Sequence, residues 1–335
     1  MRELLLLLLA FPFLLAAFPA RVAADQPPLG LGPGAEFALP ALRLRDFQAD
    51  LALGAGIMRG DTTYQIGGRY NMAGGPTQQM HFPLSELEFP LDVAVFSARG
   101  SLKFLDLVEL DASVKKSITR SSGKMKDSDW LATPDQLDIY SESDTRVDAL
   151  IWDARLRMRA FHSPDESRKA RPRYATYLGL GYLREDFDFT AGNLDQWYPS
   201  DPAAPHDRVA GDVIKYSITY SIPFVEIAQR VRAGDRLDLG GSFGYSPVVS
   251  VKDEDQHLLR SKVNVGRCQG IAFLFSFDGR YQHPRGWFLS AAVDYTRISA
   301  HGAMDASFSG VYNHTIEERI ASSQIALTGL AGYEF

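Results

Sequence analysis

Hydrophobic and polar residues alternate with a period of two along most of this chain. From Leu87 to Val95, for example, every odd-numbered residue is apolar, and the residues between them include Glu88 and Asp92. Successive side chains of a β-strand point to opposite faces, so this period predicts strands with one apolar and one polar face. Ten such stretches can be counted, near residues 47–58, 85–103, 108–120, 146–162, 174–190, 213–232, 237–252, 262–280, 286–300 and 316–335. The pattern therefore predicts an all-β protein.

A soluble β-sandwich would show the same alternation, but three features favour a membrane barrel. The alternating segments are about ten residues or longer, aromatic residues recur near their ends, and charges stand in rows on the polar face. One such row is Arg155, Arg157 and Arg159, which a packed core could not hold unpaired. The last strand also ends on an aromatic residue, Phe335, as exported outer-membrane barrels usually do. We expect a ten-stranded antiparallel transmembrane β-barrel over residues 41–335.

The connections between these stretches alternate in length. Short links at 104–107, 233–236 and 281–285, with a somewhat longer one at 163–173, alternate with longer segments at 59–84, 121–145, 191–212, 253–261 and 301–315. Short periplasmic turns and longer external loops are the usual asymmetry of outer-membrane barrels. Apolar faces would then contact lipid, and the arginine row would meet acids such as Asp92 and Asp111 in a polar lumen.

The N-terminus indicates export. Residues 4–20 form a short apolar run behind Arg2, broken by two prolines and followed by a Val-Ala-Ala exit. This order predicts a secretory signal peptide over residues 1–24. Residues 25–40 are rich in proline and glycine and are expected to form a linker. We expect the mature chain in the bacterial outer membrane.

Charge and cysteine content narrow the function. The chain has 35 Lys and Arg against 41 Asp and Glu, a net charge of −6. This acidity disfavours nucleic acid and favours cationic substrates. A single cysteine, Cys268, excludes an intramolecular disulfide framework. We expect no cofactor and no metal ion.

Two acidic clusters carry the candidate chemistry. Asp127 and Asp129 are spaced i, i+2, and so are Asp255 and His257. In an extended strand such residues point to one face, roughly 6.6 Å apart. An aspartate beside a histidine can orient the ring and stabilise its charged form, which makes a general base near neutral pH. Either cluster alone could equally consist of charged residues in a solvent-exposed loop, which are common in an acidic protein.

The direction in which each cluster faces depends on strand register. Continued alternation from the third strand sends Asp127 and Asp129 to the lumen. In the seventh strand the same extrapolation sends Asp255 and His257 outward. A β-bulge would reverse that, and Pro247 with the nearby glycines makes one plausible. The sequence leaves this point open.

Together these motifs resemble those of the omptin family, the ten-stranded outer-membrane proteases of Gram-negative bacteria. The resemblance covers essentially the whole mature chain. It is strongest at the Asp-x-Asp-Trp of Asp127–Trp130, at Asp-x-His followed by the Arg-Ser-Lys-Val of Arg260–Val263, and at the closing strand. The pairing of the first two motifs on the third and seventh strands is specific.

The resemblance implies an endopeptidase that activates water. Asp255 would orient His257, the general base. Asp127 and Asp129 would face them and share a proton, because two carboxylates so close cannot both ionise cheaply. The family's preference for basic residues at the cleavage site rests on acids in a deep pocket. Asp253 matches one of these acids and Asp61 the other, so the implied substrates are cationic polypeptides.

One departure concerns lipid. Omptins commonly carry a Tyr-x-Glu-x-Arg stretch on the fifth strand that helps bind the phosphate of lipid A. Here the stretch Tyr182–Asp186 keeps the tyrosine and reverses the charges, with Glu185 and Asp186 where the family has a cation. Lipopolysaccharide is therefore a possible partner whose usual binding motif is altered.

Three other functions compete with proteolysis. The same scaffold without catalysis would be an adhesin or a structural outer-membrane protein. A lipid-acting hydrolase would need a Ser–His pair, for which the sequence offers no persuasive spacing. A passive porin is disfavoured because ten strands leave a narrow lumen, in which the arginine row would meet acids.

Overall fold

Every regular element in the described part of the chain is a β-strand. The computed structural model describes residues 47–105, 107–163 and 173–335. The strands are β1 (Phe47–Met72), β2 (Thr77–Gln79), β3 (Ser85–Pro90), β4 (Val93–Phe104), β5 (Val108–Ser117), β6 (Ser121–Asp129), β7 (Ile139–His162), β8 (Arg173–Trp197), β9 (Asp207–Ala233), β10 (Leu237–His257), β11 (Lys262–Gln282), β12 (Trp287–Phe308) and β13 (Val311–Glu334).

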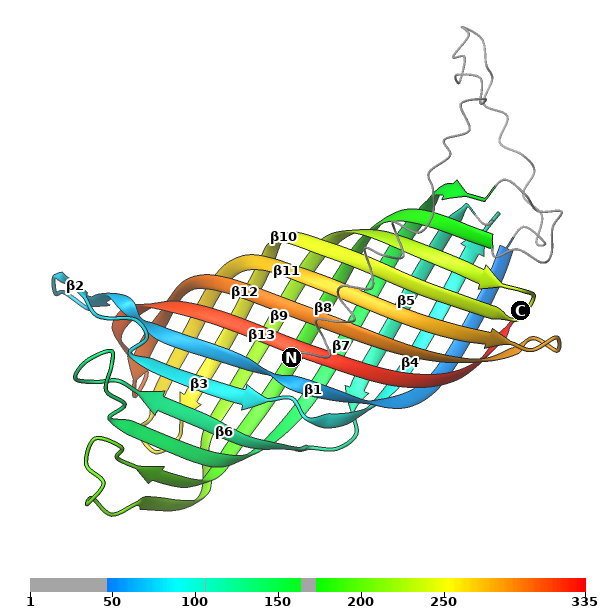
Figure 1. The fold of residues 1–335 in the computed structure, drawn as a ribbon. Coiled ribbons are helices and arrows are strands. Elements are labelled where there is room, and N and C mark those ends of the chain that lie inside the picture. The colour runs from blue at the N-terminus through cyan, green and yellow to red at the C-terminus, as the bar shows by residue number, and fades with distance from the viewer. Residues whose placement is uncertain (1–46, 106, 164–172) are drawn as a thin grey trace, which may run out of the picture. The chain divides into compact units, whose positions relative to one another are not determined.

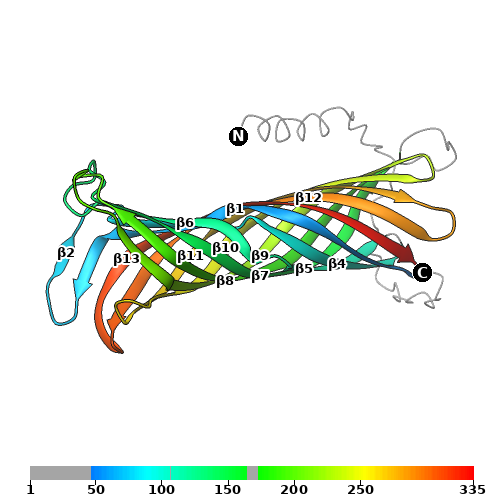
Figure 2. The ribbon, with the colours of Figure 1, turned by 90° about the horizontal axis from the view of Figure 1, so that it is seen from below.

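These strands close into an antiparallel barrel (Figures 1 and 2). Consecutive strands pair from β7 to β13, and β13 returns to pair with β1 from Asp50↔Glu334 to Met72↔His314. β3 and β4 together occupy one position of the ring, since β1 pairs with both. β5 and β6 occupy the next, since β7 pairs with both. Counted in this way the ring has ten strands, and the predicted ten-stranded β-barrel is confirmed.

Several segments expected to be long loops are instead extensions of the strands. β1 continues to Met72, β10 to His257 and β12 to Phe308. The strands from β7 to β13 contain 21 to 27 residues. A tilted strand needs about 9–11 residues to cross a bilayer. About half of the barrel therefore lies outside the membrane.

The predicted signal peptide over residues 1–24 and linker over 25–40 lie outside the described residues, as do positions 41–46 of the predicted barrel segment. In the described ranges no helix is long and apolar enough to cross a bilayer.

The outward-facing side chains divide the barrel into two halves. In the half that ends at the short turns, outward positions are apolar, as at Leu53, Leu180 and Leu289. In the other half they are polar, as at Arg267 and Arg319. The short-turn half comprises residues 47–58, 93–105, 107–115, 150–163, 173–183, 222–248, 271–296 and 325–335. The long-loop half comprises the other described residues, at 59–92, 116–149, 184–221, 249–270 and 297–324.

The interior of the short-turn half is filled by ion pairs. Arg157 lies 2.6 Å from both Asp111 and Glu226, and its side chain is 4% exposed. Lys115 lies 2.7 Å from Asp294 on the opposite wall. The alternation in this half has the predicted sense, with apolar residues toward lipid and charges inside.

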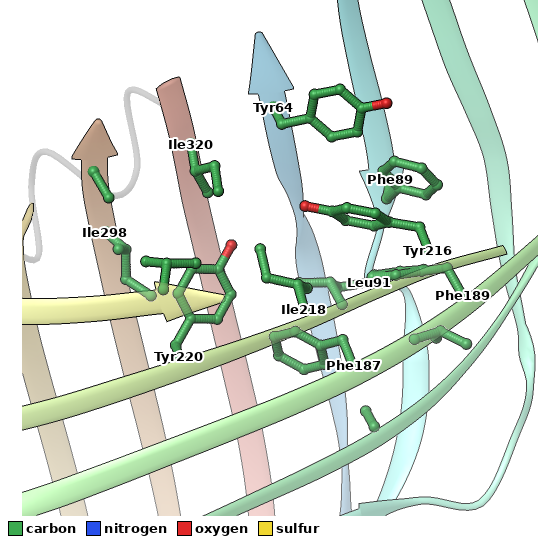
Figure 3. Packing of buried hydrophobic residues seen from close by; sticks show 14 of the residues in the cluster. Tyr64, Phe89, Leu91, Phe187, Phe189, Tyr216, Ile218, Tyr220, Ile298 and Ile320 are labelled. Atoms are coloured by element: carbon green, nitrogen blue, oxygen red, sulfur yellow. The ribbon is translucent and has the colours of Figure 1, made fainter. Parts of the chain in front are cut away.

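The interior of the long-loop half is a hydrophobic core instead. The aromatic core shown in Figure 3 is formed by Tyr64, Phe89, Phe189 and Tyr216, with the ring centroids of Phe89 and Tyr216 4.5 Å apart. The odd residues from Leu87 to Leu91 face this interior, not lipid, and Asp92 is on the outer wall 3.6 Å from Arg59. The expectation of an Asp92 in the lumen was therefore wrong. Outside the bilayer, water reverses the preferred direction of apolar side chains.

Candidate active site

A β-bulge in β10 turns its acidic end inward. The pairing of β10 with β11 shifts between Ser246 and Val249, and the two residues between them are exposed. Even-numbered residues are buried before this point and odd-numbered residues after it. The bulge therefore answers the question of register that the sequence left open. It directs three candidate residues into the interior: Asp253, Asp255 and His257.

Asp255 is completely buried and holds His257 in place. Its Oδ2 lies 2.8 Å from Nε2 of His257 and accepts a 2.6 Å hydrogen bond from the hydroxyl of Tyr64, which reaches it from β1. The side-chain amide of Asn264 donates a further bond at 3.2 Å. Burial opposes ionisation, but the hydrogen bonds from His257 and Tyr64 outweigh it and hold the pKa of Asp255 below its usual value. An ionised carboxylate can thus orient the imidazole ring.

Asp127 and Asp129 face the same interior from β6. They pair with Leu87 and Ser85 of β3, beside the strand that carries Tyr64. Burial, followed by the negative charges of Asp129 and Asp255, raises the pKa of Asp127. Burial also raises the pKa of Asp129. These two carboxyl groups therefore retain a proton more readily than isolated aspartates, and Asp127 is close enough to Asp255 to feel its charge.

Asp253 meets a second carboxyl group, Glu318 of β13. A Cβ atom added to Gly266 would lie 2.1 Å from Oδ1 of Asp253 and 2.2 Å from Oε2 of Glu318, so both groups converge over this glycine. The thiol of Cys268 also donates to Oε2 of Glu318, at 3.4 Å. Burial and then the charge of Asp255 raise the pKa of Asp253 to about 7. Asp253 and Glu318 are called the acidic pair below.

Asp61 is not brought to this site. Its neighbours in β1, Thr62 and Tyr64, are buried in the interior, and alternation therefore turns Asp61 to the outer wall. The charges around it are those of exposed residues, Glu88, Lys126 and Asp92. The expected partner of Asp253 is thus replaced in space by Glu318, which comes from the last strand instead of the first.

Glu185 also faces the interior, where it accepts a 2.5 Å hydrogen bond from Gln324. Only Tyr182, Arg184 and Asp186 of the fifth-strand motif lie on the outer wall, and Arg184 lies 2.8 Å from Asp186. The expectation that Glu185 would oppose a lipid phosphate was wrong, because adjacent residues of a strand point to opposite faces.

Four residues of the site could not be recognised from local spacing. Tyr64 and Glu318 come from the first and last strands and reach Asp255 and Asp253 only in the closed barrel. Asn264 lies opposite Asp255 in the pairing of β10 with β11. Lys262 pairs with His257 across β10 and β11, and burial lowers the pKa of its amine. Lys262 lies within the Arg-Ser-Lys-Val motif, which was the one available signal for it.

Unpaired polar atoms are concentrated here. Among the described residues, most buried side-chain oxygens without a hydrogen-bond partner belong to five residues of this region: Asp127, Tyr216, Asp253, Asp255 and Glu318. Buried polar groups are ordinarily satisfied, and exceptions cluster where a ligand or water binds. The same described residues contain no group of three or more His, Cys, Asp or Glu suited to a metal ion.

The fold and this site define a class: an outer-membrane-type β-barrel with an Asp–His pair and further carboxyl groups in its long-loop half. Residues 76–305 match the sequence model of the omptin family. The chain belongs to the omptin family. No curated protein matches it in sequence.

Among solved structures, the chain is similar to the outer-membrane protease OmpT from Escherichia coli. The TM-score is 0.72 at 17% identity, over 88% of this chain and 99% of that one. The translocator domain of the autotransporter NalP from Neisseria meningitidis matches with a TM-score of 0.31 and 12% identity, over 85% of this chain and 88% of that one. The family and the fold together indicate a protein of the bacterial outer membrane and support a protease.

Proposed function

We propose that this protein is an outer-membrane endopeptidase that cleaves polypeptides at basic residues. The observation that carries the proposal is the convergence of two pairs on one interior: Asp255 with His257 on β10, and Asp127 with Asp129 on β6. The His257 side chain is 14% exposed, so water and substrate can reach the ring while Asp255 stays buried. We propose that this end of the barrel faces the exterior of the cell.

The proposed reaction uses water as the nucleophile. His257 removes a proton from a water molecule as its oxygen bonds to the carbonyl carbon of the scissile peptide. Asp127 and Asp129, which hold a shared proton, hydrogen-bond the water and the oxygen of the tetrahedral intermediate. His257 then returns its proton to the leaving amine as the C–N bond breaks. Asp255 stays ionised and stabilises the imidazolium that forms between these steps.

The acidic pair supplies a reason for cationic substrates. Both oxygens of Asp253 and Oε1 of Glu318 are buried without hydrogen-bond partners among the described residues. Two adjoining buried carboxyl groups are strongly stabilised by a cation that can neutralise and hydrogen-bond them. We propose that the side chain of a substrate arginine or lysine supplies that cation, with Asp253 and Glu318 as substrate-binding residues. Asp61 has no part in this proposal.

Matched peptides test the reaction and its preference. The full-length chain, refolded in a nonionic detergent, is incubated with quenched peptides that differ only by Arg, Lys, citrulline or Leu at one position. We expect cleavage next to Arg and Lys, with products identified by mass spectrometry. A folded barrel that cuts none of the peptides, with or without lipopolysaccharide, would instead favour the alternative of a noncatalytic adhesin or structural barrel.

The lipid requirement is a separate part of the proposal. On the outer wall, Arg184 is bound to Asp186, which also accepts a 2.7 Å hydrogen bond from Thr219. A cation paired in this way binds an anionic headgroup less strongly than a free one. We propose that activity depends less on lipopolysaccharide than is usual in the family. A change from no activity to full activity on adding lipopolysaccharide would contradict this.

A further inference from the structure

A cavity opens at the other end of the barrel, far along the strands from the candidate active site. It has a volume of about 260 Å³ and lies at the mouth formed by the short turns. Its wall includes residues of β1, β4, β7, β8, β9, β10, β11 and β13. Neither the proposed reaction nor the acidic pair uses any of them.

The wall of this cavity is strongly cationic. It contains six Lys or Arg residues and three Asp or Glu residues, a net charge of +3 with histidine neutral. The whole chain, in contrast, has a net charge of −6. An anion that enters this mouth therefore meets a local field opposite in sign to that of the protein as a whole.

Three of the six cations form no salt bridge with a carboxylate of the described residues: Lys103, Arg159 and Arg173. Two of the three acids in the wall, Asp238 and Glu334, are engaged by other cations, and the third, Asp235, forms no ion pair with a described residue. Arg280 lies 2.6 Å from Asp50 and 2.7 Å from Glu334. Arg232 binds Asp238 with both ends of its guanidinium, at 2.7 and 3.0 Å.

Deeper in the short-turn half, inward-facing cations are paired. Arg99 lies 3.1 Å from Asp111, and Arg155 lies 2.7 Å from Asp153. The deeper inward-facing cations of this barrel are thus neutralised by neighbouring carboxylates. The three spare cations depart from that rule together, from three strands, and on one cavity. Half-buried cations that share a space repel one another unless an anion joins them.

We propose that this mouth cavity binds a small multivalent oxyanion, one that carries phosphate or carboxylate groups. Two guanidinium groups can each bind an oxyanion through two parallel N–H donors, and the lysine adds a point charge. At roughly 30 Å³ per water molecule, the cavity holds about nine waters, the space of a diphosphate or a tricarboxylate. If the active-site end faces outward, this ligand comes from the periplasm.

Calorimetric titration of the full-length protein in nonionic detergent at low salt tests the site. Pyrophosphate and citrate are the two probes, with glycerol as the neutral control. We expect saturable binding of at least one anion near one equivalent, and none of glycerol. A preference between the two anions identifies the source as a phosphate or a carboxylate compound. Absence of saturable binding by both anions overturns the proposal.

Matched variants distinguish a specific anion-binding site from general electrostatic attraction to a cationic protein surface. Substitution of all three cavity cations by glutamine, K103Q/R159Q/R173Q, should weaken binding at least tenfold. R173Q alone should weaken it several-fold and serves if the triple variant does not fold. The control, R267Q/R297Q/R319Q, removes the same charge from exposed positions on the outer wall of the long-loop half and should bind normally. Equal weakening in both triple variants would show general electrostatic attraction and refute the site.

Discussion

The two halves of this barrel share the same alternating pattern but turn opposite faces of their strands inward, the polar face in one half and the apolar face in the other. In the short-turn half, Leu53 and Leu180 face outward and the ion pairs of Arg157 fill the interior. In the long-loop half, Phe89 and Tyr216 pack inside and charged residues face outward. The first arrangement suits lipid outside and the second suits water outside. A period of two therefore identifies a strand without saying which face of it is buried.

The comparison also explains where the candidate chemistry lies. In the long-loop half, Tyr64 of the hydrophobic core hydrogen-bonds Asp255, the partner of His257, and the nearby buried Asp127 and Asp253 have raised pKa values. The short-turn half also has titratable groups in its interior, but its cations and acids are mostly paired with each other. The long-loop half, with its unpaired acids, therefore has the interior suited to catalysis. The short-turn half, with its paired charges, has an interior that stabilises the fold.

The largest expected effect on stability comes from Arg157→Met in the short-turn half. This change leaves Asp111 and Glu226 without their closest partner, which costs about 3–5 kcal/mol for a buried pair. Urea unfolding measures the loss. Arg59→Met is the control, because its pair with Asp92 is exposed and contributes about 0–1 kcal/mol. If both variants lose the same stability, the interior of the short-turn half is not held by these ion pairs.

A second variant should disturb only the long-loop half. In Gly266→Ala the new methyl group would fall about where the acidic pair meets, so one carboxyl group must move. We expect the preference for an arginine peptide over its citrulline counterpart to fall by about tenfold or more. A buried acid rejects the neutral peptide because that peptide leaves its carboxylate without a cationic partner. Gly279→Ala, whose Cβ would meet only Leu239 at 3.5 Å, is the control. An unchanged preference in Gly266→Ala would remove the acidic pair from substrate binding.

The variant Tyr64→Phe tests whether the hydrogen bond between opposite walls of the long-loop half contributes to turnover. The hydroxyl of Tyr64 crosses from β1 to Asp255 on β10. A hydrogen bond to a charged group contributes about 1.5–3 kcal/mol, so turnover should fall by about ten- to a hundredfold with little change in KM. Steady-state kinetics on one arginine peptide provide the test. A rise in KM at constant turnover would mean that Tyr64 contacts substrate instead.

The smallest expected effect is a pH dependence of specificity. Asp253 has a pKa raised to about 7, so its carboxyl group is neutral below that pH and charged above it. The preference for arginine over citrulline should therefore rise severalfold between pH 6 and pH 8. Asp253→Asn should abolish this dependence. A preference that falls with rising pH would contradict the assignment.

How much of this could be read from the sequence differs between the halves. Ten strands, Asp111 in the lumen and the inward direction of Asp127 and Asp129 followed from alternation. Extrapolated alternation sent Asp255 and His257 outward, and it is the bulge in β10 that turns them inward. The inward Phe89 did not, because alternation does not tell whether lipid or water surrounds a strand. Glu318 and Tyr64 were not predicted because they lie on the last and first strands and meet the residues of β10 only in the folded barrel, which no local motif records.

The account depends most on His257 as the general base in the long-loop half. The direct measurement is the turnover of an arginine peptide by His257→Ala, compared with His301→Ala, an exposed histidine on the outer wall. The account predicts that His257→Ala loses at least about a hundredfold in kcat while it unfolds at the wild-type urea concentration, and that His301→Ala keeps full activity. Near-normal cleavage by folded His257→Ala would contradict it.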